Sequence, residues 1–216
     1  LTVKSAKPVV LVGAMRPATA VSADGPLNII NAVKVAVDAA SAGQGVLVMM
    51  NDEIYSGRDV TKTNTANVAT FKATNGGPLG FIVGSEVHYY YRSMRPHTLQ
   101  SEFDVSGVTA LPRVDIIYTH IGEDRVFVDA ALAAGARGII YAGSGMGSIH
   151  EAVEAALAEA VGRGVVVVRS SRTGSGIVAA GLERWQEQGF LYADNLNPQK
   201  ARLLLQLVLL LSLIHI

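Results

Sequence analysis

One lysine, Lys62, lies in a dense group of side chains that can donate or accept protons. The polar residues around it are Asp59, Thr61, Thr63, Asn64 and Thr65. A lysine amine can take part in proton transfer when burial and neighbouring groups tune its affinity for the proton. The same composition is also typical of a solvated loop. The pattern therefore makes Lys62 a candidate catalytic residue and leaves its chemistry open.

The elements before Lys62 predict where it lies. Gly45–Met50 is an apolar run without a polar face, as in a strand buried on both sides. The segment Asn51–Thr65 follows at its carboxyl end, which is where ligands bind in an open α/β sheet. Upstream, Lys7–Gly13 predicts another buried strand.

Helical spacing between these two strands predicts a crossover helix over Leu27–Ala42. Its apolar residues fall on one broad stripe: Leu27, Ile30, Ala32, Val33, Ala36, Val37 and Ala40. A strand–helix–strand alternation implies parallel strands joined by right-handed crossovers. Downstream, Asn67–Lys72 reads as a short helical turn, and Phe81–Val83 with Val87–Tyr91 as a hairpin.

Residues 93–112 have little hydrophobic periodicity, which is typical of a linker. After them the alternation of strands and helices resumes. We expect strands at Val114–Tyr118, Gly138–Ala142 and Val165–Val168, with helices at Asp124–Ala134 and Ile149–Val161. The glycine-rich turn Gly143–Ser148 is superficially similar to a dinucleotide loop. No acidic residue ends the next strand in the way such a site requires, which argues against nucleotide binding.

Composition excludes several classes of function. Eighteen basic residues balance eighteen acidic ones without a charge run, so neither a nucleic acid nor a membrane surface is indicated as a partner. The chain has no cysteine, and its five histidines show no metal-ligand spacing. We expect no metal and no cofactor. The apolar tail at residues 209–216 is too short to span a bilayer as a helix.

Four blocks of the chain are informative together: Gly57–Thr65, Val12–Pro17 with Ser22–Pro26, Val168–Arg172 and Leu196–Arg202. In this combination they resemble one enzyme family, the bacterial L-asparaginases, particularly the type II group. The resemblance extends to about residue 208. It implies an α/β protein in which residues 1–92 form the remainder of an N-terminal domain with a mixed or parallel sheet. Residues 113–208 form a smaller, flavodoxin-like C-terminal domain.

The resemblance implies hydrolysis of L-asparagine to L-aspartate and ammonia by a threonine nucleophile, with Lys62 assisting proton transfer. Neither Thr-Gly-Gly-Thr nor Thr-Gly-Thr-Asp, the family's threonine motifs, occurs in these residues. We expect both motifs upstream of Leu1 and expect the isolated chain to be inactive. The family also implies a homotetramer built as a dimer of dimers, and the type II group implies the periplasm.

Three further residues match substrate-binding positions of the family. Ala14 matches a residue whose main-chain oxygen meets the substrate carboxamide. Ser148 and Glu183 align with residues that reach a neighbouring subunit's site; Ser148 also fits a helix N-cap, and Glu183 a solvated helix surface. Around them, Arg16 and Asp24 are expected to brace a loop, and Arg58 and Asp59 to form an ion pair.

Two other functions remain open. An asparaginase–glutaminase, or the amide-hydrolysing subunit of a tRNA-dependent amidotransferase, would share the chemistry, although no basic patch supports an RNA partner. A chain that only binds a small amino acid or forms subunit contacts would share the fold without catalysis. We also expect residues 209–216 to be foreign to the family.

Overall fold

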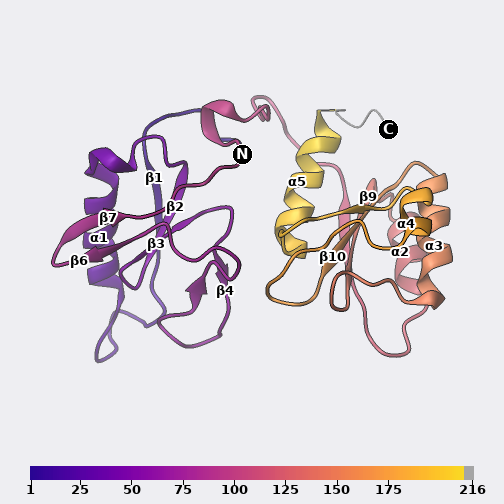
Figure 1. Ribbon diagram of the computed structural model, residues 1–216, viewed down its shortest axis with the longest axis horizontal. Coiled ribbons are helices and arrows are strands. Elements are labelled where there is room, and N and C mark those ends of the chain that lie inside the picture. The colour runs from indigo at the N-terminus through magenta and orange to yellow at the C-terminus, as the bar shows by residue number, and fades with distance from the viewer. Residues whose placement is uncertain (212–216) are drawn as a thin grey trace. The chain divides into compact units, whose positions relative to one another are not determined.

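Residues 93–112, where the alternation of strands and helices is interrupted, separate two units that each have a main sheet of their own. The computed structural model describes residues 1–211, so residues 212–216 of the apolar tail lie outside the described residues. The chain divides into one unit over Leu1–Asp104 and a second from Val105 onward, and the boundary falls inside the predicted linker (Figure 1).

The first unit contains a five-stranded mixed sheet. Its strands, in the order β1-β2-β3-β6-β7, are β1 (Val9–Val12), β2 (Val46–Met50), β3 (Glu53–Ser56), β6 (Gly80–Val83) and β7 (Glu86–Tyr89). Only β1 and β2 are parallel, with Val9 opposite Val46, and every other pair is antiparallel. The hairpin predicted around residues 84–86 is confirmed as β6–β7.

The predicted route from β2 to Lys62 is wrong. Asn51 and Asp52 both have positive φ angles, which makes a tight hairpin and sends the chain back along β2 as β3. Ser56 therefore lies opposite Leu47, near the start of β2. Lys62 follows six residues later, so the carboxyl end of β2 does not lead directly into it.

Lys62 belongs to a small antiparallel ribbon. Strands β4 (Thr61–Lys62) and β5 (Phe71–Lys72) pair with Lys62 opposite Phe71, so the helical turn predicted for Asn67–Lys72 is also wrong. The ribbon packs through Phe71 and Val60 on Val48 and Tyr55. Because residues alternate between the two faces of a strand, this is the sheet face opposite the one that packs on α1.

Helix α1 (Gly25–Val37) is confirmed, and a 3-10 turn, η1 (Ala39–Ser41), follows it. Its buried residues are Asn28, Asn31, Ala32 and Val35, whereas most of the predicted apolar stripe is exposed. The helix turns two asparagines inward because each has a polar partner there. Asn31 donates to Asp52 Oδ1 over 2.7 Å, and Asn28 bonds the main chain at two strand ends.

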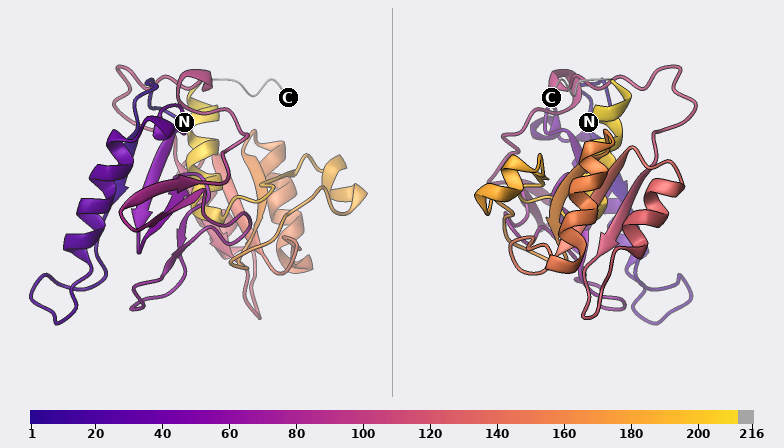
Figure 2. Two further views of the ribbon diagram at one scale, coloured as in Figure 1. Left: turned by 60° about the vertical axis from the view of Figure 1, so that its left-hand side comes forward. Right: turned by 90° about the vertical axis from the view of Figure 1, so that its right-hand side faces the viewer.

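The second unit is a three-layer α/β/α sandwich. Its parallel strands, in the order β11-β10-β9-β8, are β8 (Val114–Tyr118), β9 (Gly138–Gly143), β10 (Val166–Ser171) and β11 (Leu191–Tyr192). Helices α2 (Val126–Ala133), α3 (Glu151–Gly162) and α4 (Glu183–Glu187) pack on one face, and α5 (Pro198–Leu210) packs on the other (Figure 1; Figure 2, right).

Strand β10 is longer than its sequence predicted. The β-branched run ends at Val168, but the strand continues to Ser171, and Arg169 and Ser170 are as buried as the valines before them. Three polar residues therefore lie inside a central strand, where each must find a hydrogen-bond partner.

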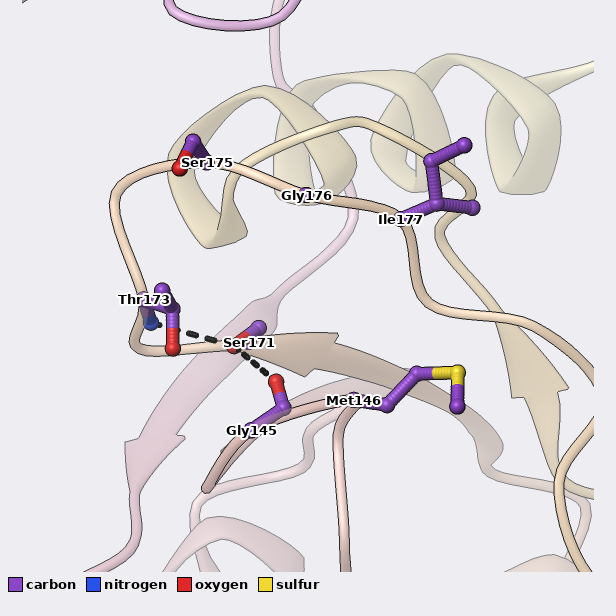
Figure 3. A pocket seen from close by; sticks show the side chains of 7 residues that line it. All are labelled: Gly145, Met146, Ser171, Thr173, Ser175, Gly176 and Ile177. Carbon is purple, nitrogen blue, oxygen red and sulfur yellow. Dashed lines mark hydrogen bonds between the residues drawn. The ribbon is translucent and has the colours of Figure 1, made fainter.

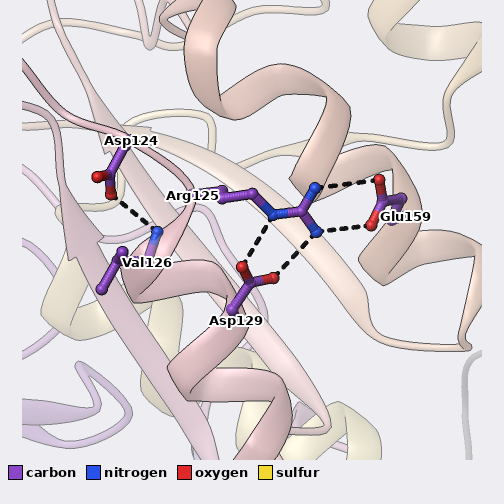
Figure 4. A network of polar contacts seen from close by, with 5 residues as sticks. All are labelled: Asp124, Arg125, Val126, Asp129 and Glu159. Atoms are coloured by element: carbon purple, nitrogen blue, oxygen red, sulfur yellow. Dashed lines mark hydrogen bonds and ion pairs between the residues drawn. The ribbon is translucent and has the colours of Figure 1, made fainter.

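On the outer helical layer, one arginine joins α2 to α3. Arg125 forms a bidentate pair with Asp129 at 2.8 and 3.0 Å and reaches Glu159 of α3 at 2.8 and 3.3 Å (Figure 4). The group is exposed, so salt screens it and its contribution to stability is small.

Over residues 1–211, the helices are all too short or too polar for a membrane crossing.

Strand β1 is a free edge within the described residues, since it pairs only with β2. Leu11 and Val12 are 55% and 40% exposed, and Val9 and Val10 are only partly buried, so the burial expected for this strand is wrong. An exposed apolar edge is a template for pairing with another chain.

We therefore predict that the isolated 216-residue chain self-associates through β1. Substituting Leu11→Lys places a charge on the edge and should shift the chain toward monomer in light scattering at matched concentration. The control is Val21→Lys, at a loop residue that is 94% exposed, which should not change the association. Equal association of all three chains would contradict the role of β1.

Candidate functional site

The loop after β1 is held by one carboxylate. Asp24 accepts hydrogen bonds from the main-chain amides of Met15 (2.9 Å) and Arg16 (2.8 Å). Burial raises the pKa of Asp24, but these amides and the Asn28 side chain outweigh it and lower the net pKa below its ordinary value. Arg16 adds a hydrogen bond to the Ser22 carbonyl at 2.8 Å. The bracing predicted for both residues is confirmed.

This brace fixes the main chain at Ala14. The Ala14 carbonyl and the Met15 amide belong to one planar trans peptide, so holding the amide toward Asp24 turns the carbonyl the opposite way. The preceding Gly13 carbonyl accepts from Asn28 Nδ2 at 3.0 Å. A Cβ built at Gly25 would lie 3.2 Å from Ala14 Cβ, so α1 approaches Ala14 closely here and a side chain at position 25 would be crowded.

Lys62 lies in the β4–β5 ribbon, and the chain on either side of it is held in place by its neighbours. Arg58 and Asp59 form the predicted ion pair at 2.6 Å. Beyond Lys62, the buried Thr70 accepts from the Asn64 amide at 2.7 Å through its hydroxyl and from the Thr63 amide at 2.8 Å through its carbonyl. Lys62 itself is exposed.

Ser148 ends a turn in which two glycines, Gly143 and Gly147, cannot be replaced without movement. A Cβ at Gly143 would lie 2.3 Å from the Ser148 carbonyl oxygen. Gly147 has a φ of 76°, and a Cβ there would lie 2.8 Å from Val178. Ser148 is exposed and its amide donates to the Ser144 carbonyl at 2.9 Å. Its predicted role as a helix N-cap is wrong, because α3 begins at Glu151 and His150 caps it.

A shallow pocket of about 230 Å³ lies beside this turn. Its lining residues are Gly145, Met146, Ser171, Thr173, Ser175, Gly176 and Ile177 (Figure 3). The Ser171 hydroxyl donates to the Gly145 carbonyl at 2.5 Å and accepts from the Thr173 amide at 3.0 Å. These contacts fix the turn from β10, and the pocket wall carries no charged side chain.

Glu183 is the first residue of α4 and is exposed, which fits the predicted solvated helix surface and leaves its carboxylate accessible. The next residue, Arg184, pairs with Glu154 of α3 at 2.9 Å. The buried Trp185 anchors the helix in the core.

Sequence reasoning missed two residues that organise these positions, Thr70 and Arg169. Thr70 carries no sequence signal beyond its type. For Arg169 the sequence did carry a signal, because this arginine directly follows four valines. If the buried strand continues past Val168, the Arg169 charge must be buried as well.

In the part of the chain that the structure describes, no group of three or more acidic or histidine side chains is arranged to hold a metal ion.

Comparison with known protein families gives two matches in chain order. The model "Asparaginase, N-terminal" matches residues 1–95, and "Glutaminase/Asparaginase C-terminal domain" matches residues 113–213.

Individual proteins agree with these matches. L-asparaginase 2 of Escherichia coli (strain K12) is 50% identical over 97% of this chain and 60% of its own length. A probable periplasmic L-asparaginase of Haemophilus influenzae is also 50% identical, over 97% and 60%. A glutaminase-asparaginase of Pseudomonas fluorescens biotype A is 43% identical over 97% and 58%. The chain thus spans about three fifths of the length of these relatives.

A solved structure shares the fold. The crystal structure of a probable cytoplasmic L-asparaginase from Campylobacter jejuni superposes with a TM-score of 0.94 at 47% identity, covering 97% of this chain and 69% of that one.

The Asp24 brace predicts a defined pH dependence of stability. Because the folded-state pKa lies below the ordinary value of 3.8, the stabilisation is complete above about pH 3.8 and is lost as the pH falls through the folded pKa. Asp24→Ala should lower the free energy of unfolding by about 1–3 kcal/mol at neutral pH.

The matched control is Asp24→Asn, which keeps the size and one acceptor oxygen without the charge. Its deficit relative to the parent should shrink as denaturant melts are taken below pH 3.8. A deficit that stays constant through that range would show that the Asp24 charge does not stabilise the loop.

Proposed function

Since this chain belongs to the bacterial L-asparaginase family, we propose that the protein carrying it hydrolyses the side-chain amide of L-asparagine to L-aspartate and ammonia. The observation that carries the proposal is 50% identity to an L-asparaginase over 97% of the chain. The chain contributes part of the catalytic machinery. These 216 residues contain neither of the threonine motifs in which the family carries its nucleophile.

Lys62 is the residue of this chain that we assign to proton transfer. Hydrolysis of the amide needs a proton taken from the attacking hydroxyl and one delivered to the departing nitrogen. A lysine on an exposed but rigid ribbon can serve these two proton transfers when another segment of the protein covers it. The Thr70 hydrogen bonds and the Arg58–Asp59 pair hold its main chain on both sides.

The Ala14 carbonyl is assigned to the substrate carboxamide. Its orientation is set by the Asp24 brace rather than by the substrate, so the acceptor is in place before binding. An amide N–H donor suits this carbonyl, and the carboxylate product lacks such a donor. This difference favours release of L-aspartate.

Ser148 and Glu183 are assigned to the substrate site of a neighbouring subunit in a homotetramer assembled as a dimer of dimers. Both side chains are exposed in the chain by itself, and both stand on elements anchored by buried residues. Rigid, exposed polar groups of this kind can complete a site across an interface.

We propose L-asparagine rather than L-glutamine as the preferred substrate, in support of which two bacterial relatives named as L-asparaginases are each 50% identical to this chain and the Pseudomonas fluorescens glutaminase-asparaginase is 43% identical. For location we propose the periplasm, with the Haemophilus relative in support. The Campylobacter protein is titled cytoplasmic, so fractionation of the source cells is the deciding observation.

Replacing Lys62 by methionine should lower kcat for L-asparagine by about 10²–10⁴-fold in the native protein, the usual contribution of general acid–base catalysis. KM should change far less, because the side chain acts on protons rather than on binding. The control is Lys72→Met on the facing strand, where the lysine pairs with Glu53 at 2.6 Å. Parental kcat in Lys62→Met would remove the lysine from the mechanism.

The 216-residue chain by itself should release no ammonia from L-asparagine. Intact mass with N-terminal sequencing of the protein from its source should reveal a longer chain with both threonine motifs. Ammonia release by the isolated chain, lost on Lys62→Met, would instead place the nucleophile within these residues.

A further inference from the structure

Arg169 is a buried cation whose hydrogen bonds reach two separate segments. It lies inside β10 and is 1% exposed. Its Nε donates to the Gly147 carbonyl at 3.2 Å, and Nη2 donates to the Met146 carbonyl at 3.3 Å. On the other side, Nη1 donates to the Ala180 carbonyl at 2.6 Å and Nη2 to the Ala179 carbonyl at 3.0 Å.

The same guanidinium stacks on the only tryptophan of the chain. The Arg169 Cζ lies 4.2 Å from the ring centroid of Trp185 in α4. Gly181 allows this approach, since a Cβ there would lie 2.6 Å from Arg169 Nη1 and 2.8 Å from the Trp185 ring. Arginine, glycine and indole thus form one packed unit.

Stability alone does not explain this arrangement, because burying the Arg169 charge costs free energy of folding. No carboxylate pairs with Arg169 within residues 1–211, and burial lowers its pKa. Burying a charge carries a desolvation penalty that apolar side chains of similar volume avoid. What the guanidinium provides, and a hydrocarbon side chain cannot, is a rigid fork of donors that binds several carbonyls at once.

The two bonded segments lead to the two residues assigned to the neighbouring site. Met146 and Gly147 immediately precede Ser148, and Ala179 and Ala180 lie just before Glu183. We propose that Arg169 is a positioning residue that holds the Ser148 turn and the start of α4 as one rigid body. Resting on the function proposed above, the inference is that Arg169 sets substrate affinity at the neighbouring subunit without touching substrate.

A second residue of β10 separates this role from simple anchoring of the turn. The Ser171 hydroxyl bonds the Gly145 carbonyl and the Thr173 amide, and neither group belongs to the Ala179–Ala180 segment before α4. Removing its hydroxyl should loosen the turn alone. Removing the Arg169 guanidinium should loosen both segments together.

The first experiment measures hydrogen exchange by mass spectrometry on the native protein and needs no catalysis. Arg169→Met should speed amide exchange in residues 144–149 and 179–184 together, whereas Ser171→Ala should affect only 144–149. Arg169→Lys, which keeps the charge and some donors, should fall between the parent and Arg169→Met. The matched control is Arg125→Met, in the same unit but on the outer helical layer, which should affect neither segment.

The second experiment measures steady-state kinetics with L-asparagine. Arg169→Met should raise KM about tenfold while kcat falls less than KM rises, because uniform binding rather than proton transfer is weakened. Arg169→Lys should recover part of the affinity, and Arg125→Met should match the parent. Acrylamide should also quench the fluorescence of Trp185 more strongly in Arg169→Met, because the indole becomes more accessible.

The outcomes separate the two proposals. Coupled exchange in both segments supports the positioning role, even if the parent protein does not hydrolyse asparagine, a result that would overturn the proposed function alone. Exchange that rises in one segment only, or an unchanged KM in an Arg169→Met protein whose exchange has risen in both, would overturn the positioning role. If Arg169→Met does not fold, Arg169→Lys carries the same comparisons.

Discussion

Main-chain groups left unpaired where strands end must find partners, and this constraint organises both units. In the first unit, Asp24 and Asn28 bind the amides and carbonyls that follow β1 and β2. In the second, Arg169 and Ser171 do the same for the turn after β9. In each case a side chain from a neighbouring element fixes main chain beside a residue assigned to substrate binding.

Sequence reasoning succeeded where local hydrophobic patterns decide the structure and failed where pairing of distant polar groups decides it. Apolar runs and helical spacing mark buried strands and crossover helices, so the sequence predicted β2, β8, β9, α2 and α3 but not α4. The orientation of α1 was not predicted either, because hydrophobicity favoured Leu27 and Val33 as the inner face. The buried face instead carries Asn28 and Asn31, and the value of an inward asparagine depends on strand ends that lie far away in sequence.

The sequence singled out Lys62 as a candidate, but its expected place in the fold was wrong. The return strand β3 is only four residues long and depends on positive φ angles at Asn51 and Asp52, which an Asn-Asp pair permits but does not announce. Thr70 could not be predicted either, because its hydroxyl holds the loop only once the fold brings the Asn64 amide against it. Long-range polar contacts of this kind leave little trace in local sequence.

The blocks that identify the family differ in chemistry, and this difference is informative. Gly57–Thr65 contains a side chain suited to catalysis, whereas Val12–Pro17 with Ser22–Pro26 and Val168–Arg172 mainly supply main-chain groups and the side chains that hold them. The orientation of the Ala14 carbonyl, which we assign to the substrate, depends on Asp24, so changing Asp24 would disturb it without changing Ala14. Under the proposed function, activity would therefore depend on residues that never meet the substrate, and we propose Arg169 as one of them.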